Sequence, residues 1–307
     1  NPVEGQVWYN TTSNVLKGSS VSPVGAWSTG GSLNTAREVL AGAGASNTAV
    51  LAFGGYEPSY FAVTESYNGT NWTEVNDLNT AREDLGGAGT NTAALAFGGN
   101  TGSRTGATET WNGTNWTEVN DLTTARKQLA GAGASNTASL AYGGSTPPGG
   151  TTGVTENWNG TNWTEVNDLN SSRQQLAGNG TNTSALGIGG NTPGGITANT
   201  ELWNGTNWTE VNNLNTGRYI LAAAGTDNTS ALAFGGDTPP VTGKTEEWNG
   251  TNWTEVADMS TARKQLAGAG IVTSSLAFGG DTGPATTVAA TEEWNVPTAV
   301  TVTFTDS

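Results

Sequence analysis

A unit of about 45 residues occurs six times along this chain. An arginine recurs at intervals of 44 to 47 residues, and a Gly-Gly pair and a Thr-Glu-x-aromatic segment recur with it in constant order. A period in this range is typical of architectures in which each unit buries its faces against its neighbours. We therefore expect one repeat body. The arginines are Arg37, Arg82, Arg126, Arg173, Arg218 and Arg263.

The second unit, 81–120, shows the plan of one repeat. Residues 85–89 are mostly Gly and Ala, which suits a strand at a crowded axis because only small residues let neighbouring backbones approach closely. Residues 93–97 form a short apolar run, 107–111 alternate with period two, and 116–119 follow an Asn-Gly turn. Four short antiparallel strands with no helical period favour a β-propeller blade over a helical solenoid.

Four landmarks of the unit resemble the kelch repeat: the Gly-Gly pair after the second strand, the aromatic residue in the third, the Trp in the fourth, and the Arg that opens the next unit. The resemblance covers nearly all of residues 26–295 and recurs in phase six times. It implies an all-β, six-bladed kelch-type β-propeller with four antiparallel strands per blade. This expectation agrees with the strand pattern.

The way in which the ring closes follows from the position of one tryptophan. After Trp294 the fourth-strand Trp of the last unit, which begins near Arg263, is missing. Trp27 precedes Arg37 by ten residues, the same spacing that separates these landmarks in the second unit. We therefore expect the N-terminal strand around Trp27 to complete the last blade, which removes exposed sheet edges.

The two ends of the chain do not repeat. Residues 6–17 have the pattern of a small hairpin outside the ring, and they resemble short Trp-Tyr-Asn segments of bacteriophage tail and fibre proteins. The resemblance implies a virion origin. The tail alternates apolar and polar residues and is expected to add to a sheet edge, to pair with the first hairpin, or to join another chain. The expected organisation is an attachment segment (1–20), the propeller (21–297) and a strand-like tail (298–307).

Charge and composition exclude several functions. The net charge is -15 with only 11 Lys and Arg, so phosphate backbones are repelled and we expect no nucleic-acid partner. No apolar run approaches the roughly 20 residues that span a bilayer, so we expect no membrane insertion. The chain has neither Cys nor His, which excludes Ser-His-Asp and Cys-His nucleophiles and most zinc and copper sites.

We therefore expect no enzymatic activity and no cofactor. A calcium site is left open, because Asp237 and Asp281 follow Gly-Gly pairs where loop carbonyls would complete a site.

The repeated arginines have two interpretations. Some six-bladed lectins hold sugars between blades with Arg, Glu and Trp, so Arg37, Arg82, Arg126, Arg173, Arg218 and Arg263 are candidate ligand contacts. In the other interpretation each Arg bridges the backbone or a carboxylate of a neighbouring blade. Uniform repetition favours this scaffolding role.

The loops between the second and third strands differ in every unit, and they emerge on the same face as the connections that carry the arginines. Variable loops on a rigid scaffold are common recognition sites, although drift of solvent loops gives the same pattern. We select Tyr56, Tyr60, Phe61, Arg104 and Lys244 as candidate contacts. The loops are 56–63, 100–107, 145–154, 191–199, 237–244 and 281–290.

The sequence favours a non-enzymatic exterior binding or decoration module on a phage virion, such as a tail-fibre or capsid-surface protein. Its expected location is extracellular or on the virion surface, and its expected partners are a host-surface glycan or other virion or surface proteins. A secreted multivalent lectin and a carboxylate-dependent glycan-acting enzyme are the alternatives. The identity of the ligand and the oligomeric state are left open.

Overall fold

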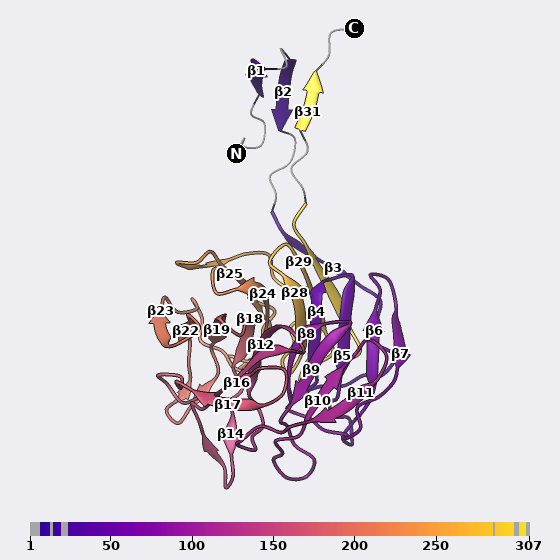
Figure 1. Cartoon of the computed structure of the whole chain (residues 1–307). Coiled ribbons are helices and arrows are strands. Elements are labelled where there is room, and N and C mark those ends of the chain that lie inside the picture. The colour runs from indigo at the N-terminus through magenta and orange to yellow at the C-terminus, as the bar shows by residue number, and fades with distance from the viewer. Residues whose placement is uncertain (1–6, 13–14, 20–23, 285, 298–300, 305–307) are drawn as a thin grey trace.

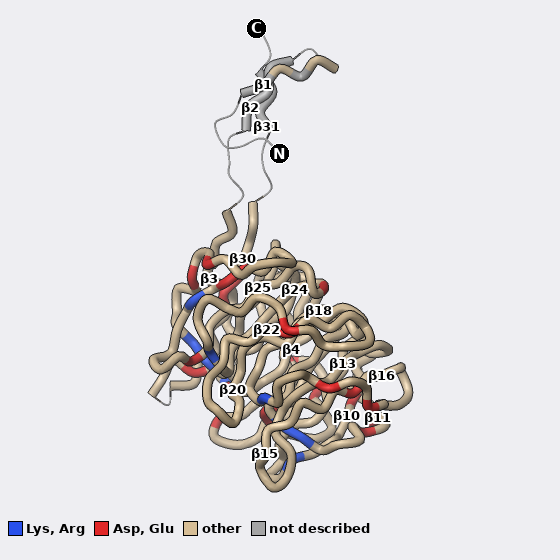
Figure 2. The backbone as a smooth tube through the Cα atoms, turned by 90° about the vertical axis from the view of Figure 1, so that its left-hand side faces the viewer, with Lys and Arg blue, Asp and Glu red and all other residues tan. Residues whose placement is uncertain are grey.

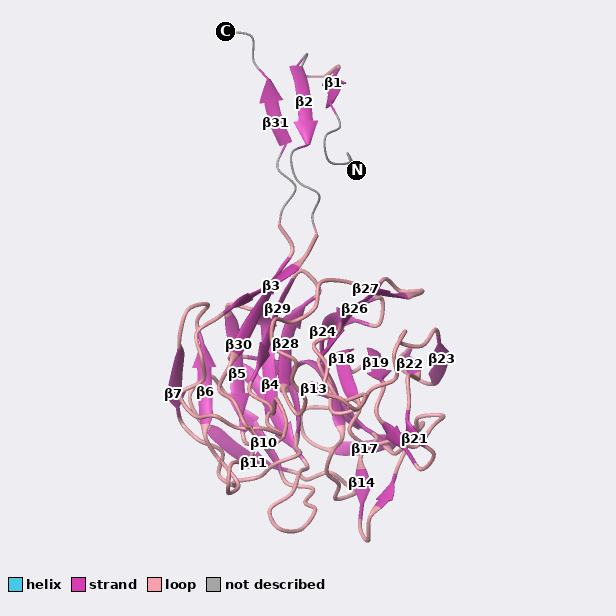
Figure 3. Cartoon of the chain, turned by 180° about the vertical axis from the view of Figure 1, so that it is seen from behind, coloured by secondary structure: helices cyan, strands magenta, loops and turns pink. Residues whose placement is uncertain are grey.

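The computed structural model describes residues 7–12, 15–19, 24–284, 286–297 and 301–304. These residues form strands, turns and loops, and they contain no helix (Figure 3). Accordingly, no helix that could span a membrane is found in this part of the chain. Six four-stranded antiparallel sheets form the body of the molecule (Figure 1).

The first three blades run from the inner to the outer strand in chain order. Blade 1 contains β4 (Ala41–Ser46), β5 (Ala49–Phe53), β6 (Thr64–Tyr67) and β7 (Trp72–Val75). Blade 2 contains β8 (Gly86–Thr90), β9 (Ala93–Phe97), β10 (Thr108–Trp111) and β11 (Trp116–Val119). Blade 3 contains β12 (Ala130–Ser135), β13 (Ala138–Tyr142), β16 (Thr155–Trp158) and β17 (Trp163–Val166).

The other three blades follow the same plan, except that the outer strand of blade 6 comes from the start of the chain. Blade 4 contains β18 (Ala177–Thr181), β19 (Ser184–Ile188), β22 (Thr200–Trp203) and β23 (Trp208–Val211). Blade 5 contains β24 (Ala222–Asp227), β25 (Ser230–Phe234), β26 (Thr245–Trp248) and β27 (Trp253–Glu255). Blade 6 contains β28 (Ala267–Ile271), β29 (Ser274–Phe278), β30 (Thr291–Asn295) and β3 (Ala26–Thr29).

The ring closes as the sequence predicts. β3 pairs antiparallel with β30, with Trp27 opposite Trp294. The inner strands contact one another in a closed circle, and β28 of blade 6 meets β4 of blade 1. These contacts confirm a six-bladed β-propeller in which an N-terminal strand completes the last blade.

The apolar core lies between the blades. One cluster joins Leu51 and Phe53 of blade 1 to Leu85, Trp111 and Trp116 of blade 2. Each fourth-strand Trp also donates its indole N–H to a third-strand Thr of the preceding blade at 2.9 to 3.1 Å. Trp27 takes part in this circle through Thr245, although it is only partly buried where the other five fourth-strand Trp are buried.

A small sheet lies apart from the ring (Figure 1). It contains β1 (Val7–Asn10), β2 (Val15–Ser19) and β31 (Thr301–Phe304), with β2 in the centre. Of the three arrangements expected for the tail, the structure shows the pairing with the first hairpin. Residues 1–6, 13–14, 20–23, 298–300 and 305–307 of the predicted end segments and of the stretch after the first one lie outside the described residues.

The two faces of the ring differ in what they carry. Ala26, the first residue of β3, lies opposite Asn295, the last residue of β30, so both connections to the small sheet leave from one face. The loops between the second and third strands lie at the other ends of the strands. Two of these loops form small hairpins, β14 (Ser145–Thr146) with β15 (Gly150–Thr151) and β20 (Asn191–Thr192) with β21 (Gly195–Ile196). Figure 1 shows β14 on the side of the ring away from both termini.

Candidate functional site

The variable loops and the connections that carry the arginines share one face, as the sequence predicts. Glu38 of the connection and Tyr56 of the first loop exchange two backbone hydrogen bonds, at 3.0 and 3.2 Å. The equivalent residues of the other five units form the same bridge. We call this surface, made by the six loops and the residues that follow the arginines, the loop face.

The structure brings several of the predicted contacts together. The rings of Tyr56 and Tyr60 pack edge to face with their centroids 5.7 Å apart. Phe61 is half-buried in the same loop, and its N–H donates to the carbonyl of Gly55 at 2.8 Å. The side-chain amide of Asn100 in the second loop donates to the Tyr60 hydroxyl at 3.5 Å, so the first two loops touch.

Arg104 links the second loop to the third. Its Nε–H donates to the carbonyl of Ser145 at 3.1 Å and its Nη2 to the Ser145 hydroxyl at 3.0 Å. None of the ion pairs among the described residues includes Arg104. Its guanidinium is therefore fixed in place without being neutralised by a carboxylate.

Lys244 lies away from these groups. It ends the fifth loop and forms an ion pair with Glu255 of the outer strand, at 2.6 Å. The hydrogen bond from this exposed pair raises the pKa of Lys244. Lys244 therefore does not share a site with Tyr56, Tyr60 and Arg104.

The six repeated arginines are all fully buried. Arg126 donates to the carbonyls of Ala141 and Gly143 at 3.3 and 3.4 Å and pairs with Glu156 at 3.0 Å, all within its own blade. Its own carbonyl accepts from the N–H of Gly99 in the preceding blade at 2.9 Å. Burial lowers the pKa of Arg126 to about 10, although the charge of Glu156 acts in the opposite direction.

Each third-strand glutamate completes this buried network. Glu156 accepts the N–H and the hydroxyl of Thr123, both at 2.7 Å, in addition to the guanidinium of Arg126. The other five units have an equivalent ion pair, at 3.0 to 3.3 Å. The carboxylate partner lies in the same blade as the Arg, and the contact to the neighbouring blade is made by the Arg carbonyl. This geometry suits a scaffolding role, and it leaves none of the six repeated guanidinium groups exposed to a ligand.

The two aspartates considered for calcium surround a lysine instead. The Lys264 ammonium lies 3.2 Å from Asp237 Oδ2 and 4.0 Å from Asp281 Oδ2. Burial alone would lower the pKa of Lys264, but the hydrogen bond and charge of Asp237 raise it above its ordinary value. No group of three or more carboxylates in the described part of the chain is arranged to hold a metal. These residues do not fit a calcium site, because the ammonium supplies the positive charge.

Sequence reasoning missed six residues at the centre of the loop face. Each lies two positions after a repeated Arg and has a positive φ, between 49° and 59°. Each N–H donates at 2.8 to 2.9 Å to the carbonyl of the equivalent residue in the preceding blade, which gives a closed circle of six backbone hydrogen bonds. We call this circle the axial mouth. Its members are Val39, Asp84, Gln128, Gln175, Ile220 and Gln265.

The axial mouth surrounds a cavity of about 100 Å³, and the leucines that follow its six members form the remaining wall. A positive φ costs a residue other than glycine about 1 to 3 kcal/mol, and β-branched residues such as Val39 and Ile220 adopt it least readily. The sequence does contain a sign of this site. Each of the six units contains the segment Arg-x-x-Leu, in which the Arg and the Leu are constant and the two residues between them vary.

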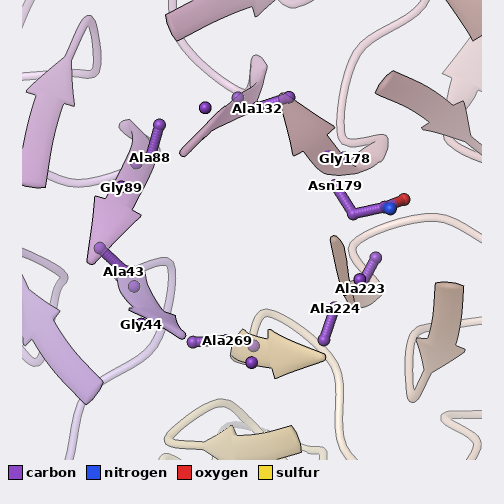
Figure 4. A pocket seen from close by; sticks show the side chains of 18 residues that line it. Ala43, Gly44, Ala88, Gly89, Ala132, Gly178, Asn179, Ala223, Ala224 and Ala269 are labelled. Carbon is purple, nitrogen blue, oxygen red and sulfur yellow. The ribbon is translucent and has the colours of Figure 1, made fainter. Parts of the chain in front are cut away.

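Below the mouth, the channel along the axis is lined almost entirely by Gly and Ala (Figure 4). Asn179 is the exception. In Figure 4 its amide points away from the channel, and it donates to the Asp227 carbonyl in the next blade at 2.9 Å. The channel wall therefore offers few side chains to a ligand, in contrast to the mouth.

No family model matches the sequence, and no curated protein matches it either. The six-bladed propeller is established by the structure. The kelch-type assignment and the resemblance of the N-terminal segment to phage proteins stay predictions from the sequence.

Proposed function

We propose that this chain is a non-enzymatic binding or decoration module on the exterior of a phage particle, and that its loop face contacts a host-surface glycan or another virion protein. The opposite face, from which both termini leave, would hold the module on its parent assembly through the small sheet. The proposal places the protein outside the cell, on the virion surface.

The observation that carries this proposal is the polarity of the ring. Both connections to the small sheet leave from one face, because β3 begins where β30 ends. The six unlike loops lie on the other face, where they are free of the attachment. A rigid scaffold that separates an anchor from a set of variable loops has the geometry of a display module.

The position of the polar groups also favours the loops over the spaces between blades. A lectin with repeated inter-blade sites needs exposed Arg, Glu or Trp side chains between the blades, and here the repeated Arg and the third-strand Glu are buried and paired. The loop face has the packed Tyr56 and Tyr60 rings and the unpaired guanidinium of Arg104. We therefore place recognition in the loops.

A loop graft tests the proposal. Residues 56–63 are replaced by the eight residues of 100–107, and the wild-type and grafted chains are applied to an oligosaccharide array and to virions of the phage that encodes the chain. We expect the graft to lose or change the binding that the wild type shows. Glu118→Gln on the outer wall is the matched control and should bind like the wild type. Identical binding by graft and wild type would contradict the proposal, as would conversion of an array sugar into a product.

A further inference from the structure

We propose that the axial mouth binds a single neutral saccharide unit at the end of a glycan. This inference rests on the proposed function, because it assigns the ligand class and the position of one contact on the loop face. It is carried by the conformation, the sequence variation and the chemistry of the six residues of the mouth.

The conformation indicates that the side chains of the mouth are used. Twenty-five glycines in the described part of the chain have a positive φ, so the chain commonly places Gly where the backbone needs it. The six other residues with a positive φ in this part all belong to the axial mouth. The backbone circle does not require a side chain, since only N–H and carbonyl groups form it. Six strained side chains at one place therefore point to a role beyond the fold.

The sequence variation points in the same direction. The Arg before each variable pair and the Leu after it are constant in all six units, because both hold the scaffold. The mouth between them contains three glutamines, one aspartate and two aliphatic residues. If these six residues served only the backbone circle, we would expect the same residue type in every blade.

The polar residues of the mouth suit hydroxyl groups. Each glutamine amide offers both donors and an acceptor, which is what a sugar hydroxyl needs. Gln128 and Gln175 lie on consecutive blades, and Asp84 before them pairs with Lys127 at 3.1 Å. Val39 and Ile220 are the apolar members and suit the C–H face of a sugar ring. Few polar groups and an apolar wall are typical of small-molecule sites.

Charge around the mouth favours a neutral ligand. Glu38 and Glu83 precede two of its members, and burial together with Asp281 and Glu57 raises the pKa of Glu38. Lys264 and Lys127 are each engaged by aspartates. The mouth has no basic lining residue, and an acidic sugar would approach it in a chain of net charge -15, so we exclude uronates and sialates from the proposed class.

The size of the site limits how much of the ligand enters. The cavity of about 100 Å³ is smaller than the roughly 300 to 1,000 Å³ of pockets that enclose a drug-sized molecule. The channel beneath it has a wall of small residues with few groups to hold a second unit. The mouth therefore takes the terminal unit of a glycan, and the rest of the glycan lies across the loops.

The test removes two side chains without straining the fold. In Gln128→Gly/Gln175→Gly the backbone keeps its hydrogen bonds, and glycine is the residue that best accepts their φ values of 59° and 57°. The wild type, this variant and the outer-wall variant Glu118→Gln are each titrated with methyl glycosides of glucose, galactose, mannose, N-acetylglucosamine and glucuronic acid. Binding is followed by saturation-transfer NMR, and folding by thermal melting.

We expect at least one neutral glycoside to bind the wild type and Glu118→Gln, with at least tenfold weaker binding to the double-glycine variant, which should melt no lower than the wild type. Binding of no neutral glycoside, of the glucuronide alone, or of a neutral glycoside equally by all three proteins would overturn the inference. If the double-glycine variant also keeps the array or virion binding that the loop graft loses, the inference fails while the proposed function stands. If the loop graft at residues 56–63 binds like the wild type, the proposed function itself is wrong.

Discussion

At the scale of single residues, the repeated arginines show how a residue that looks like a ligand contact serves the fold. Arg126 is fully buried and is bonded to carbonyls of its own blade and to Glu156, while its carbonyl accepts from the preceding blade. A buried ion pair stabilises little compared with an apolar pair of the same shape, but removing one partner leaves a buried charge without compensation. The pair therefore makes each blade sensitive to single substitutions.

Arg126→Ala should lower the stability of the ring and not merely its binding. The change leaves the Glu156 carboxylate buried without its ion-pair partner, at a cost of about 3 to 5 kcal/mol. For a chain of 307 residues we expect a drop in melting temperature of roughly 5 to 8 °C, measured by circular dichroism. The double variant Arg126→Met/Glu156→Gln should recover part of the loss. If Arg126→Ala melts like the wild type but binds differently, the scaffolding interpretation is wrong and Arg126 is a ligand contact.

At the scale of elements, one strand decides whether the ring is closed. β3 comes from the start of the chain and pairs with β30, so blade 6 joins segments that are more than 260 residues apart in the sequence. Without β3, the outer edge of β30 would be exposed and the indole bond from Trp27 to Thr245 would be lost. The closing strand links the beginning of the repeat to its end.

Deletion of residues 1–30 should therefore destabilise the whole ring. Removal of a fully buried Trp costs about 3 to 5 kcal/mol, and the partly buried Trp27 contributes less, but this deletion also removes a strand of backbone pairing. We expect a sharp fall in melting temperature in a scanning calorimeter. Deletion of residues 1–19, which removes β1 and β2 but keeps β3, is the control and should shift the melt by no more than about 2 °C. Equal melts for the wild type and the longer deletion would rule out this closure.

At the scale of the whole molecule, charge is distributed unequally between the loop face and the outer wall. The cations of the ring other than the six buried arginines are Arg104, Lys127, Lys244 and Lys264, and all four lie in the loops or in the connections beside them. Figure 2 shows the basic segments of the backbone in blue and the acidic segments in red. The outer strands present exposed glutamates in equivalent positions of successive blades. Among the described residues only Glu255 of this set has a basic partner. The set is Glu74, Glu118, Glu165, Glu210 and Glu255.

Salt should stabilise this protein. Repulsion along the acidic wall opposes the compact state, and the screening length falls to about 10 Å at 0.1 M salt. The buried Arg–Glu pairs are shielded from salt and should change little. We expect the melting temperature to rise between 20 mM and 0.5 M sodium chloride, and the rise to shrink in Glu74→Gln/Glu118→Gln/Glu165→Gln. A melting temperature that falls with salt would show that surface ion pairs outweigh the repulsion.

Local, periodic patterns made most of the fold predictable. Each sign of the fold lies within a few residues: an alternating strand, an Asn-Gly turn, or a Gly-Gly pair that ends a strand. A single unit would be ambiguous, but the same signs recur in six units. Even the closure was predictable, because Trp27 keeps the spacing to Arg37 that the other units show. The contact between the Tyr56 and Arg104 loops was less predictable, since it depends on how neighbouring blades pack.

The blade, the number of blades and the strand that closes the ring follow from the amino-acid sequence, because each is set by a short-range pattern and by its repetition. Which polar residues are buried within a blade and which line the axial mouth depends on how the blades pack in the folded ring. Arg126 and Gln128 are two residues apart, yet one is buried within a blade and the other lines the axial mouth. The six residues of the axial mouth are about 45 positions apart in the sequence, and they meet at the axis only in the closed ring. The positive φ of each goes with the hydrogen bond that it makes to the preceding blade in that ring.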